Sequence, residues 1–143
     1  MKPIRSFSEF LNEGIVKKQF QDKSRAEFLK KESTQAEEFL SKIIEKFGIT
    51  NENANTIVKE SYDILMSLIR ARMLIQGFNS SGQGAHEAEV AYLREIGVNE
   101  IDVQLADQLR YSRNGIMYYG KNMDPGYAKK AIEVMKRIKE KLG

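Results

Sequence analysis

The sequence predicts an all-α fold, an antiparallel up-and-down bundle of about five helices. Prolines stand only at positions 3 and 125 of the 143 residues, so most of the chain lacks a residue that breaks helices. The stretches between them are rich in Ala, Leu, Ile, Glu and Lys, which favour helices. We find no segment in which apolar and polar residues alternate as they do in a half-buried strand.

We expect a single domain over residues 22–143, preceded by an arm or short helix over residues 1–21. The first long helix is predicted to begin near Ser24, because Ser24 and Glu27 have the spacing of a capping box. It should end at Gly48, since glycine is common just after a helix. Its buried stripe is expected to consist of large apolar side chains: Phe28, Phe39, Leu40, Ile43, Ile44 and Phe47.

The next segments predict two helices separated by a loop. One helix is expected over about 53–76, because apolar residues recur along it at spacings of three and four. Residues 77–84 include three glycines and are predicted to form a loop. A shorter helix over about 85–96 should bury Val90 and Leu93 and end at Gly97. The predicted buried face of the earlier helix consists of Ile57, Ser61, Ile64, Leu65, Leu68, Arg72 and Ile75.

The last two helices have clear end signals. The fourth helix is predicted over about 99–119, where Gly120 stops it, with Ile101, Leu105, Leu109, Ser112 and Ile116 along one stripe. Asp124 and Pro125 then predict the start of the fifth helix, with an aspartate as N-cap and proline in the first position. This helix should run to about Leu142 and bury Ala128, Ala131, Ile132, Met135 and Ile138.

The composition excludes several kinds of active site. The chain has no cysteine, which excludes disulfides, thiolate nucleophiles and cysteine-bound zinc or iron–sulfur centres. His86 is its one histidine, so a multi-histidine metal site within one chain is impossible and a Ser-His-Asp triad is not favoured. The Glu-x-x-His motif of carboxylate metal sites in helical bundles is absent, because Gln83 precedes His86 by three residues. We predict no metal site and no cofactor.

The sequence predicts a cytoplasmic protein without a membrane segment. Its apolar runs, such as residues 64–66, are broken within a few residues, and the opening Met-Lys-Pro-Ile-Arg lacks the apolar core of a signal peptide. The formal net charge of +3 is mildly basic, well below that of a dedicated nucleic-acid-binding protein.

Three features each allow a functional and a structural interpretation. Gly82 and Gly84 can cradle a phosphate, but the segment lacks the lysine and the Ser/Thr of a P-loop, which favours a plain connector. His86 can act as a general base, or it can cap or pack the first turn of its helix. The last helix holds six basic residues against Glu133 and Glu140, which suits either an RNA-facing surface or a solvated outer face.

The end of the fourth helix carries the most unusual cluster. Arg110 and Asn114 are four residues apart and share a face, and Arg113 lies about 60° from Arg110 around the helix. Gly115 within the helix indicates close packing or a constrained site. Alternatively, the arginines pair with carboxylates while Tyr118 and Tyr119 cap the core; the carboxylates available for this are Asp102, Asp107 and Glu60.

Three segments in this order carry a resemblance to a known family. They are residues 60–74 of the second helix, residues 77–88 leading into the third helix, and Arg113-Asn114 followed by an aromatic pair and Gly120. Over residues 24–142 the chain resembles the HEPN-domain family, small α-helical bundles of prokaryotic toxin–antitoxin, defence and RNA-processing systems. The family signature is an arginine, a polar residue and then a histidine after an interval of four to six.

The resemblance implies a homodimer in which the fourth helices of two subunits face each other across a cleft. In active relatives this cleft is a metal-independent endoribonuclease, in which a base activates the ribose 2′-hydroxyl and arginine stabilises the phosphate charge. It also implies a nucleotidyltransferase-type antitoxin as partner. The implied catalytic residues are Arg113, Asn114, Tyr118 and Tyr119, and the implied phosphate-binding residues are Arg110, Arg113 and Lys121.

The chain departs from the family at the histidine. Intervals of four, five and six from Arg113 lead to Tyr118, Tyr119 and Gly120. A phenol with a pKa of about 10 supplies little base at neutral pH, so we expect binding of RNA or nucleotide phosphate with RNase activity weak or lost. His86 stands on another helix and would have to reach the cleft from the partner subunit. The alternative function is a non-catalytic helical module that docks a partner protein.

Overall fold

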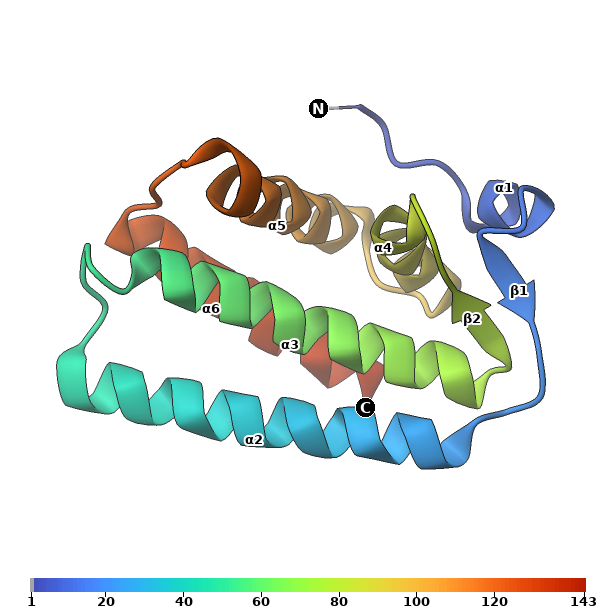
Figure 1. Cartoon of the computed structure of the whole chain (residues 1–143), viewed down its shortest axis with the longest axis horizontal. Helices are drawn as coiled ribbons and strands as arrows, with labels where there is room; N and C mark the ends of the chain where they lie inside the picture. Colours follow the sequence, from blue (N-terminus) through green and yellow to red (C-terminus); the bar gives the residue numbers. More distant parts are fainter. Residues whose placement is uncertain (1) are drawn as a thin grey trace.

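The computed structural model describes residues 2–143, and over this range it contains six helices and one two-stranded sheet (Figure 1). The all-α prediction is confirmed in its coarse form, a mostly helical bundle. The elements in chain order are α1 (Phe7–Asn12), β1 (Val16–Lys18), α2 (Lys23–Phe47), α3 (Ala54–Ile75), β2 (Phe78–Ser80), α4 (Ala85–Glu95), α5 (Glu100–Tyr119) and α6 (Pro125–Leu142).

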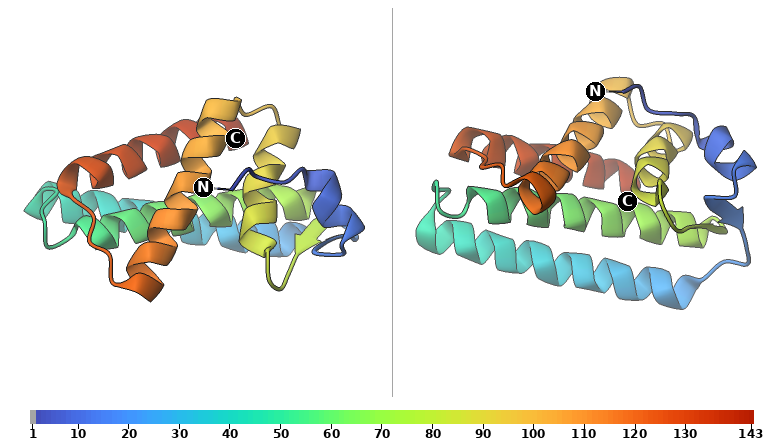
Figure 2. Two further views of the ribbon diagram at one scale, coloured as in Figure 1. Left: turned by 90° about the horizontal axis from the view of Figure 1, so that it is seen from above. Right: turned by 45° about the horizontal axis from the view of Figure 1, so that its top comes forward.

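The centre of the fold is α3, which packs against α2, α4, α5 and α6. Figures 1 and 2 show α2 and α3 running side by side in opposite directions, while α5 lies across the long helices. The antiparallel up-and-down order predicted for the whole bundle is therefore not confirmed. This crossing matters for function, because it brings the C-terminal half of α5 near the start of α4.

The predicted ends of the later helices agree with the structure. Gly120 adopts a left-handed conformation with φ +64° and ends α5. The Asp124 side chain accepts a hydrogen bond from the Tyr127 N–H at 2.7 Å, and Pro125 opens α6. The start of α2 differs slightly, since Asp22 is its N-cap and accepts from the Arg25 N–H at 3.1 Å.

The prediction that the chain has no strand and that 77–84 is only a loop is wrong. β1 and β2 pair antiparallel, with Lys17 opposite Asn79, and each strand has three residues. Such short strands show no period in the sequence, and their partners are far apart along the chain. Gly77 is required beside this sheet, because its φ is +84° and an added Cβ would lie 2.8 Å from the Gln19 carbonyl oxygen.

The apolar stripe predicted on the first long helix, α2, is also wrong in part. Phe28, Phe39 and Phe47 are 60%, 64% and 63% exposed, whereas Leu40 is buried. The face that α2 turns to its neighbours holds small residues, including the buried Ala26 and Ser33. Small side chains let two helices approach closely, so the size of a side chain on α2 does not predict its burial.

Two further details concern the core, one on α5 and one on the N-terminal arm. Ile101, predicted on the buried stripe of α5, is 75% exposed, and Asp102 and Asp107 are buried on that helix instead. The N-terminal arm is well packed, because Phe7 and Phe10 of α1 belong to the main hydrophobic core. In the part of the chain that the structure describes, no helix is long and apolar enough to cross a membrane.

Candidate functional site

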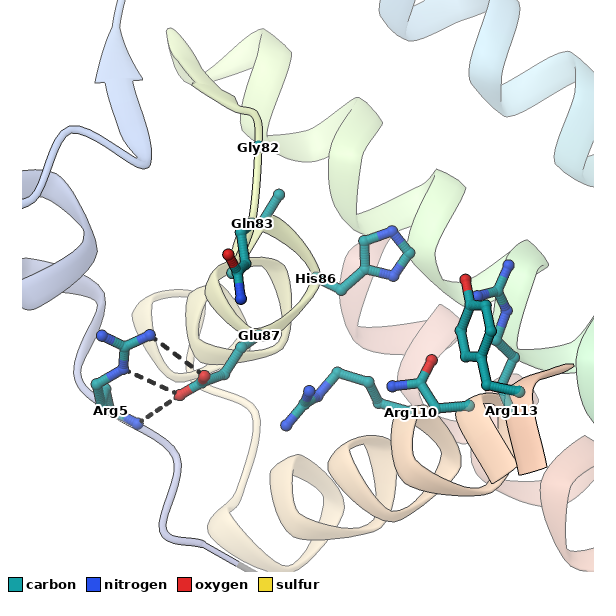
Figure 3. Close-up of a pocket in the computed structure, with 11 residues that line it drawn as sticks. Arg5, Gly82, Gln83, His86, Glu87, Arg110 and Arg113 are labelled. Carbon is teal, nitrogen blue, oxygen red and sulfur yellow. Dashed lines mark hydrogen bonds and ion pairs between the residues drawn. The ribbon is translucent and has the colours of Figure 1, made fainter. Parts of the chain in front are cut away.

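A pocket of about 710 Å³ lies between α4, α5 and the N-terminal arm (Figure 3). Three segments that are distant in sequence line it: Arg5 of the arm, residues 82–87 around the start of α4, and four side chains of α5. The α5 residues are Arg110, Arg113, Asn114 and Tyr118. The crossing of α5 over the bundle thus joins the arginine cluster, the glycine-rich loop and His86, which the sequence analysis had considered separately.

Arg110 is held by a carboxylate on its own helix. Its Nε donates to Oδ1 of Asp107 at 2.8 Å, and Asp107 is fully buried. The guanidinium also stacks on the Tyr111 ring, 4.7 Å from its centroid. Figure 3 shows the Arg110 side chain extending toward Glu87. The alternative in which an arginine pairs with Asp107 therefore holds for Arg110, but the residue still lines the pocket.

Arg113 is in a different situation. Within residues 2–143 it takes part in no ion pair, and its buried Nε has no hydrogen-bond partner. Partial desolvation raises the pKa of Asp63, and the positive charge of Arg113 opposes that rise. The unpartnered Nε costs stability, and because the guanidinium has no carboxylate partner within residues 2–143, its positive charge can attract an anion that enters the pocket.

His86 lines the same pocket from the first turn of α4 and extends toward the side of α5 that carries Arg113 (Figure 3). Its Nδ1 lies 3.0 Å from the hydroxyl of the fully buried Tyr62, and the two rings stack. Desolvation lowers the pKa of His86, and the charges of Arg70 and Arg113 lower it further against Glu89 and Asp63. At neutral pH the imidazole is therefore uncharged.

The start of α4 opens toward the pocket as well. Gly84 is its N-cap, with a φ of +90° that favours glycine, and residues 82–87 contribute to the lining. Over the described residues no side chain caps this helix end. Free backbone N–H groups at the start of a helix favour a negative charge nearby, which adds to the effect of the arginines.

Glu87 is the one carboxylate among the side chains that line the pocket, and Arg5 neutralises it. The Arg5 backbone N–H donates to Glu87 at 3.2 Å, and its guanidinium also contacts Glu13. Burial raises the pKa of Glu87, but the hydrogen bonds from Arg5 outweigh it and lower the pKa overall. Arg5 and Arg110 thus have carboxylate partners, and within residues 2–143 Arg113 is the guanidinium of the lining whose positive charge is not compensated by an ion pair.

Two of the predicted site residues lie outside this pocket. Tyr119 is 77% exposed, and the Lys121 side chain packs over Gly115, where an added Cβ would lie 3.1 Å from the Lys121 Cδ. The close packing predicted at Gly115 is therefore confirmed. Tyr118 is 68% exposed at the pocket, so the alternative in which the tyrosines cap the core is wrong.

A second charged cluster, one turn further along α4, was missed by the sequence analysis. Glu89 is 1% exposed, and Arg70 of α3 binds it with two hydrogen bonds of 2.6 and 3.0 Å. The hydroxyl of Ser80 in β2 donates to the same carboxylate at 2.9 Å. No sequence pattern indicates this cluster, because its members come from three separate elements.

No grouping of three or more His, Asp or Glu side chains suited to a metal ion occurs within residues 2–143. We compared the chain with known proteins, and no family model, curated protein or solved structure matches it. The chemistry of the pocket is therefore argued from its geometry: cationic and neutral donors surround a space with one compensated carboxylate, an arrangement that recognises an anion.

Proposed function

We propose that this chain is a HEPN-like homodimeric protein that binds RNA or nucleotide phosphate in the pocket between α4 and α5, with RNase activity weak or lost. The proposal places it in a toxin–antitoxin or nucleotidyltransferase-associated system. One observation carries it: the Arg113 guanidinium lies in the pocket without an ion-pair partner from residues 2–143, beside Arg110 and Asn114.

The chemistry of the α5 residues supports a phosphate as ligand. A guanidinium presents a planar fork of N–H donors that matches two phosphate oxygens, and the Asn114 amide adds a neutral donor. Arg110 contacts Asp107 through a single hydrogen bond from Nε, which leaves its other N–H donors free for a ligand. Arg113 is then the main phosphate ligand and Arg110 supports it.

The aromatic residue in the lining favours a nucleotide over inorganic phosphate. Tyr118 is largely exposed, so its ring can stack on an unpaired base while the arginines hold the adjacent phosphate. Such stacking contributes about 1–3 kcal/mol per base in proteins that bind single strands. Single-stranded RNA is therefore the proposed class of ligand.

Exposed apolar groups on α5 support the homodimer. Met117, Tyr118 and Tyr119 are 47%, 68% and 77% exposed at the end of this helix. A cluster of large exposed apolar side chains is typical of an interface. In the proposed dimer the two copies meet through α5, so that both pockets open into one cleft.

The test compares two variants that each remove one positive charge. Arg113→Gln is expected to weaken binding of a short labelled single-stranded RNA by about ten- to a hundredfold, since a hydrogen bond to a charged group contributes about 1.5–3 kcal/mol. Lys42→Gln, at an exposed position of α2, is the matched control and should leave affinity nearly unchanged. Equal losses in both variants would point to nonspecific attraction and contradict the proposal.

Two further measurements complete the test. Light scattering of the purified protein should give the mass of a dimer, and incubation with RNA in EDTA should give little or no cleavage. If the wild-type protein binds neither RNA nor nucleotide, the non-catalytic docking module remains, and the exposed Phe28, Phe39 and Phe47 of α2 are the surface to examine for it.

A further inference from the structure

The pair formed by Tyr62 and His86 limits what the histidine can do. The Tyr62 side chain is fully buried, and in the described part of the chain the His86 Nδ1, at 3.0 Å, is the one hydrogen-bond partner of its hydroxyl. A buried hydroxyl hydrogen needs an acceptor. Because burial raises the pKa of Tyr62, the hydroxyl keeps its proton, and that proton is satisfied when it points at Nδ1.

This contact determines the tautomer of the imidazole. An uncharged histidine that accepts at Nδ1 carries its own hydrogen on Nε2. The opposite tautomer would place two hydrogens between Tyr62 and Nδ1, or would turn the hydroxyl hydrogen away without an acceptor. The nitrogen that remains for a ligand is therefore a donor, whereas a general base would need a free lone pair there.

On balance the surroundings of the ring favour the uncharged form, because desolvation and the charges of two arginines outweigh the two carboxylates nearby. On α3 it faces Tyr62, Asp63 and Arg70, and on α5 it faces Arg113. The remaining carboxylate nearby, Glu89 of α4, is already bound by Arg70 and by Ser80. The positive charge of Arg113 in the same pocket further disfavours an imidazolium.

We propose that His86 is a phosphate ligand of this pocket, donating a hydrogen bond from Nε2–H alongside Arg113, and that Tyr62 fixes it in this role. The inference rests on the proposed function and deepens it. The role of His86 as a donor explains, from the residues of one chain, why RNase activity is weak or lost. The one imidazole near the phosphate is a donor, so no histidine base of the same chain is available for the 2′-hydroxyl.

The tautomer can be measured directly, because the chain contains one histidine and its ring nitrogens give an unambiguous NMR signal. Nitrogen-15 spectra at neutral pH are expected to show hydrogen on Nε2 in the wild-type protein. Tyr62→Phe keeps a stacked ring but removes the hydroxyl, so a mixture of the two tautomers is expected. Hydrogen on Nδ1 in the wild-type protein would overturn the inference.

The RNA affinity of variants at position 86 distinguishes a hydrogen-bond donor from a general base. His86→Gln keeps a side-chain N–H donor and should bind short single-stranded RNA within about threefold of wild type, while His86→Ala should bind about three- to tenfold more weakly. Inorganic phosphate is the second probe and should shift the Nε2–H resonance on binding. Thermal unfolding of both variants verifies that they remain folded.

The outcomes distinguish this inference from the function on which it rests. If wild-type protein binds no RNA or phosphate, both fail. If Arg113→Gln loses affinity while His86→Ala does not, or if His86→Gln and His86→Ala lose affinity equally, this inference alone is wrong. RNA cleavage by the wild-type protein that disappears in His86→Gln would show that His86 is a base and would also overturn it.

Discussion

Two guanidinium groups lie near the start of α4 and differ in what they contact. Arg70 forms two short hydrogen bonds with the buried Glu89, a carboxylate that also accepts from Ser80. Arg113 lines an open pocket and, within residues 2–143, has no carboxylate partner. We refer to Arg70, Glu89 and Ser80 as the buried cluster and to Arg113 with Arg110 and Asn114 as the open cluster.

The comparison indicates that the charged residues that stabilise this fold are different from the charged residues that can bind a ligand. The buried cluster joins α3, α4 and β2, and every strong charge in it has a partner, so it contributes to a single arrangement of these elements. The open cluster leaves charge uncompensated, which costs stability and leaves donors free for a ligand. We therefore expect changes in the buried cluster to act on unfolding and changes in the open cluster to act on binding.

The largest effect on stability is expected from Glu89→Gln. Removing the charge of this buried carboxylate leaves Arg70 without its partner, and breaking a buried ion pair costs about 3–5 kcal/mol. Urea unfolding monitored by circular dichroism measures the change. The double variant Arg70→Leu, Glu89→Leu should recover much of the loss, because it leaves no unpaired charge. A loss below about 1 kcal/mol for Glu89→Gln would mean that the buried cluster is not structural.

An intermediate loss of stability is expected from Asp107→Asn, because Asp107 shares features of the buried cluster and of the open cluster. Asp107 is fully buried like Glu89, yet its single partner is Arg110 of the open cluster, and its Oδ2 has no partner within the described residues. We expect a loss of about 1–3 kcal/mol in the free energy of unfolding together with tighter RNA binding, because Arg110 is released. Weaker binding would indicate that Asp107 orients Arg110 for the ligand.

Arg113→Leu is expected to leave the free energy of unfolding within about 1 kcal/mol of wild type, because the variant removes a buried donor that has no partner. The same variant should lose RNA binding, so stability and affinity change independently. Urea unfolding and fluorescence anisotropy with labelled RNA measure the two quantities on one preparation. A large loss of stability would show that Arg113 belongs to the core and not to a binding site.

Features of the fold and the site that depend on residues close in sequence could be predicted, whereas contacts between distant residues could not. The end of α5 at Gly120, the start of α6 at Asp124 and the shared face of Arg110 and Asn114 depend on residues close in sequence, and all three could be predicted. The contact of Arg5 with Glu87 joins residues 82 positions apart, and no local pattern indicates it.

The predictions that were wrong concern features that depend on packing between segments distant in sequence. The paired strands depend on the distant register of β1 with β2, and the burial of Glu89 depends on Arg70 of another helix. On α2, small residues face the bundle while Phe28 and Phe39 face outward, so side-chain size misled the prediction of the buried face. The chemistry of α5 could be predicted from its residues, but the position of His86 beside it could not, because that position depends on the angle at which α5 crosses the bundle.

The smallest effect on stability is expected at an exposed ion pair, with which the effects in the buried cluster and the open cluster can be compared. Arg94 binds Glu100 at 2.7 and 3.0 Å, and the Glu100 side chain is 55% exposed. The hydrogen bonds from Arg94 and Gln104 lower the pKa of Glu100 from 4.5 to about 2. Solvent screens such a pair, so Glu100→Gln should cost less than about 1 kcal/mol at neutral pH.

The pH dependence of this small loss follows from the direction of the pKa shift. A carboxylate whose pKa is lower in the folded state contributes stability that is present above pH 4.5 and disappears as the pH falls toward about 2. Wild type and Glu100→Gln should therefore differ in Tm at pH 7 and converge in acid. If their difference is constant over this range, the glutamate does not contribute through its charge. If Glu100→Gln loses as much stability as Glu89→Gln, burial does not explain the larger effect expected in the buried cluster.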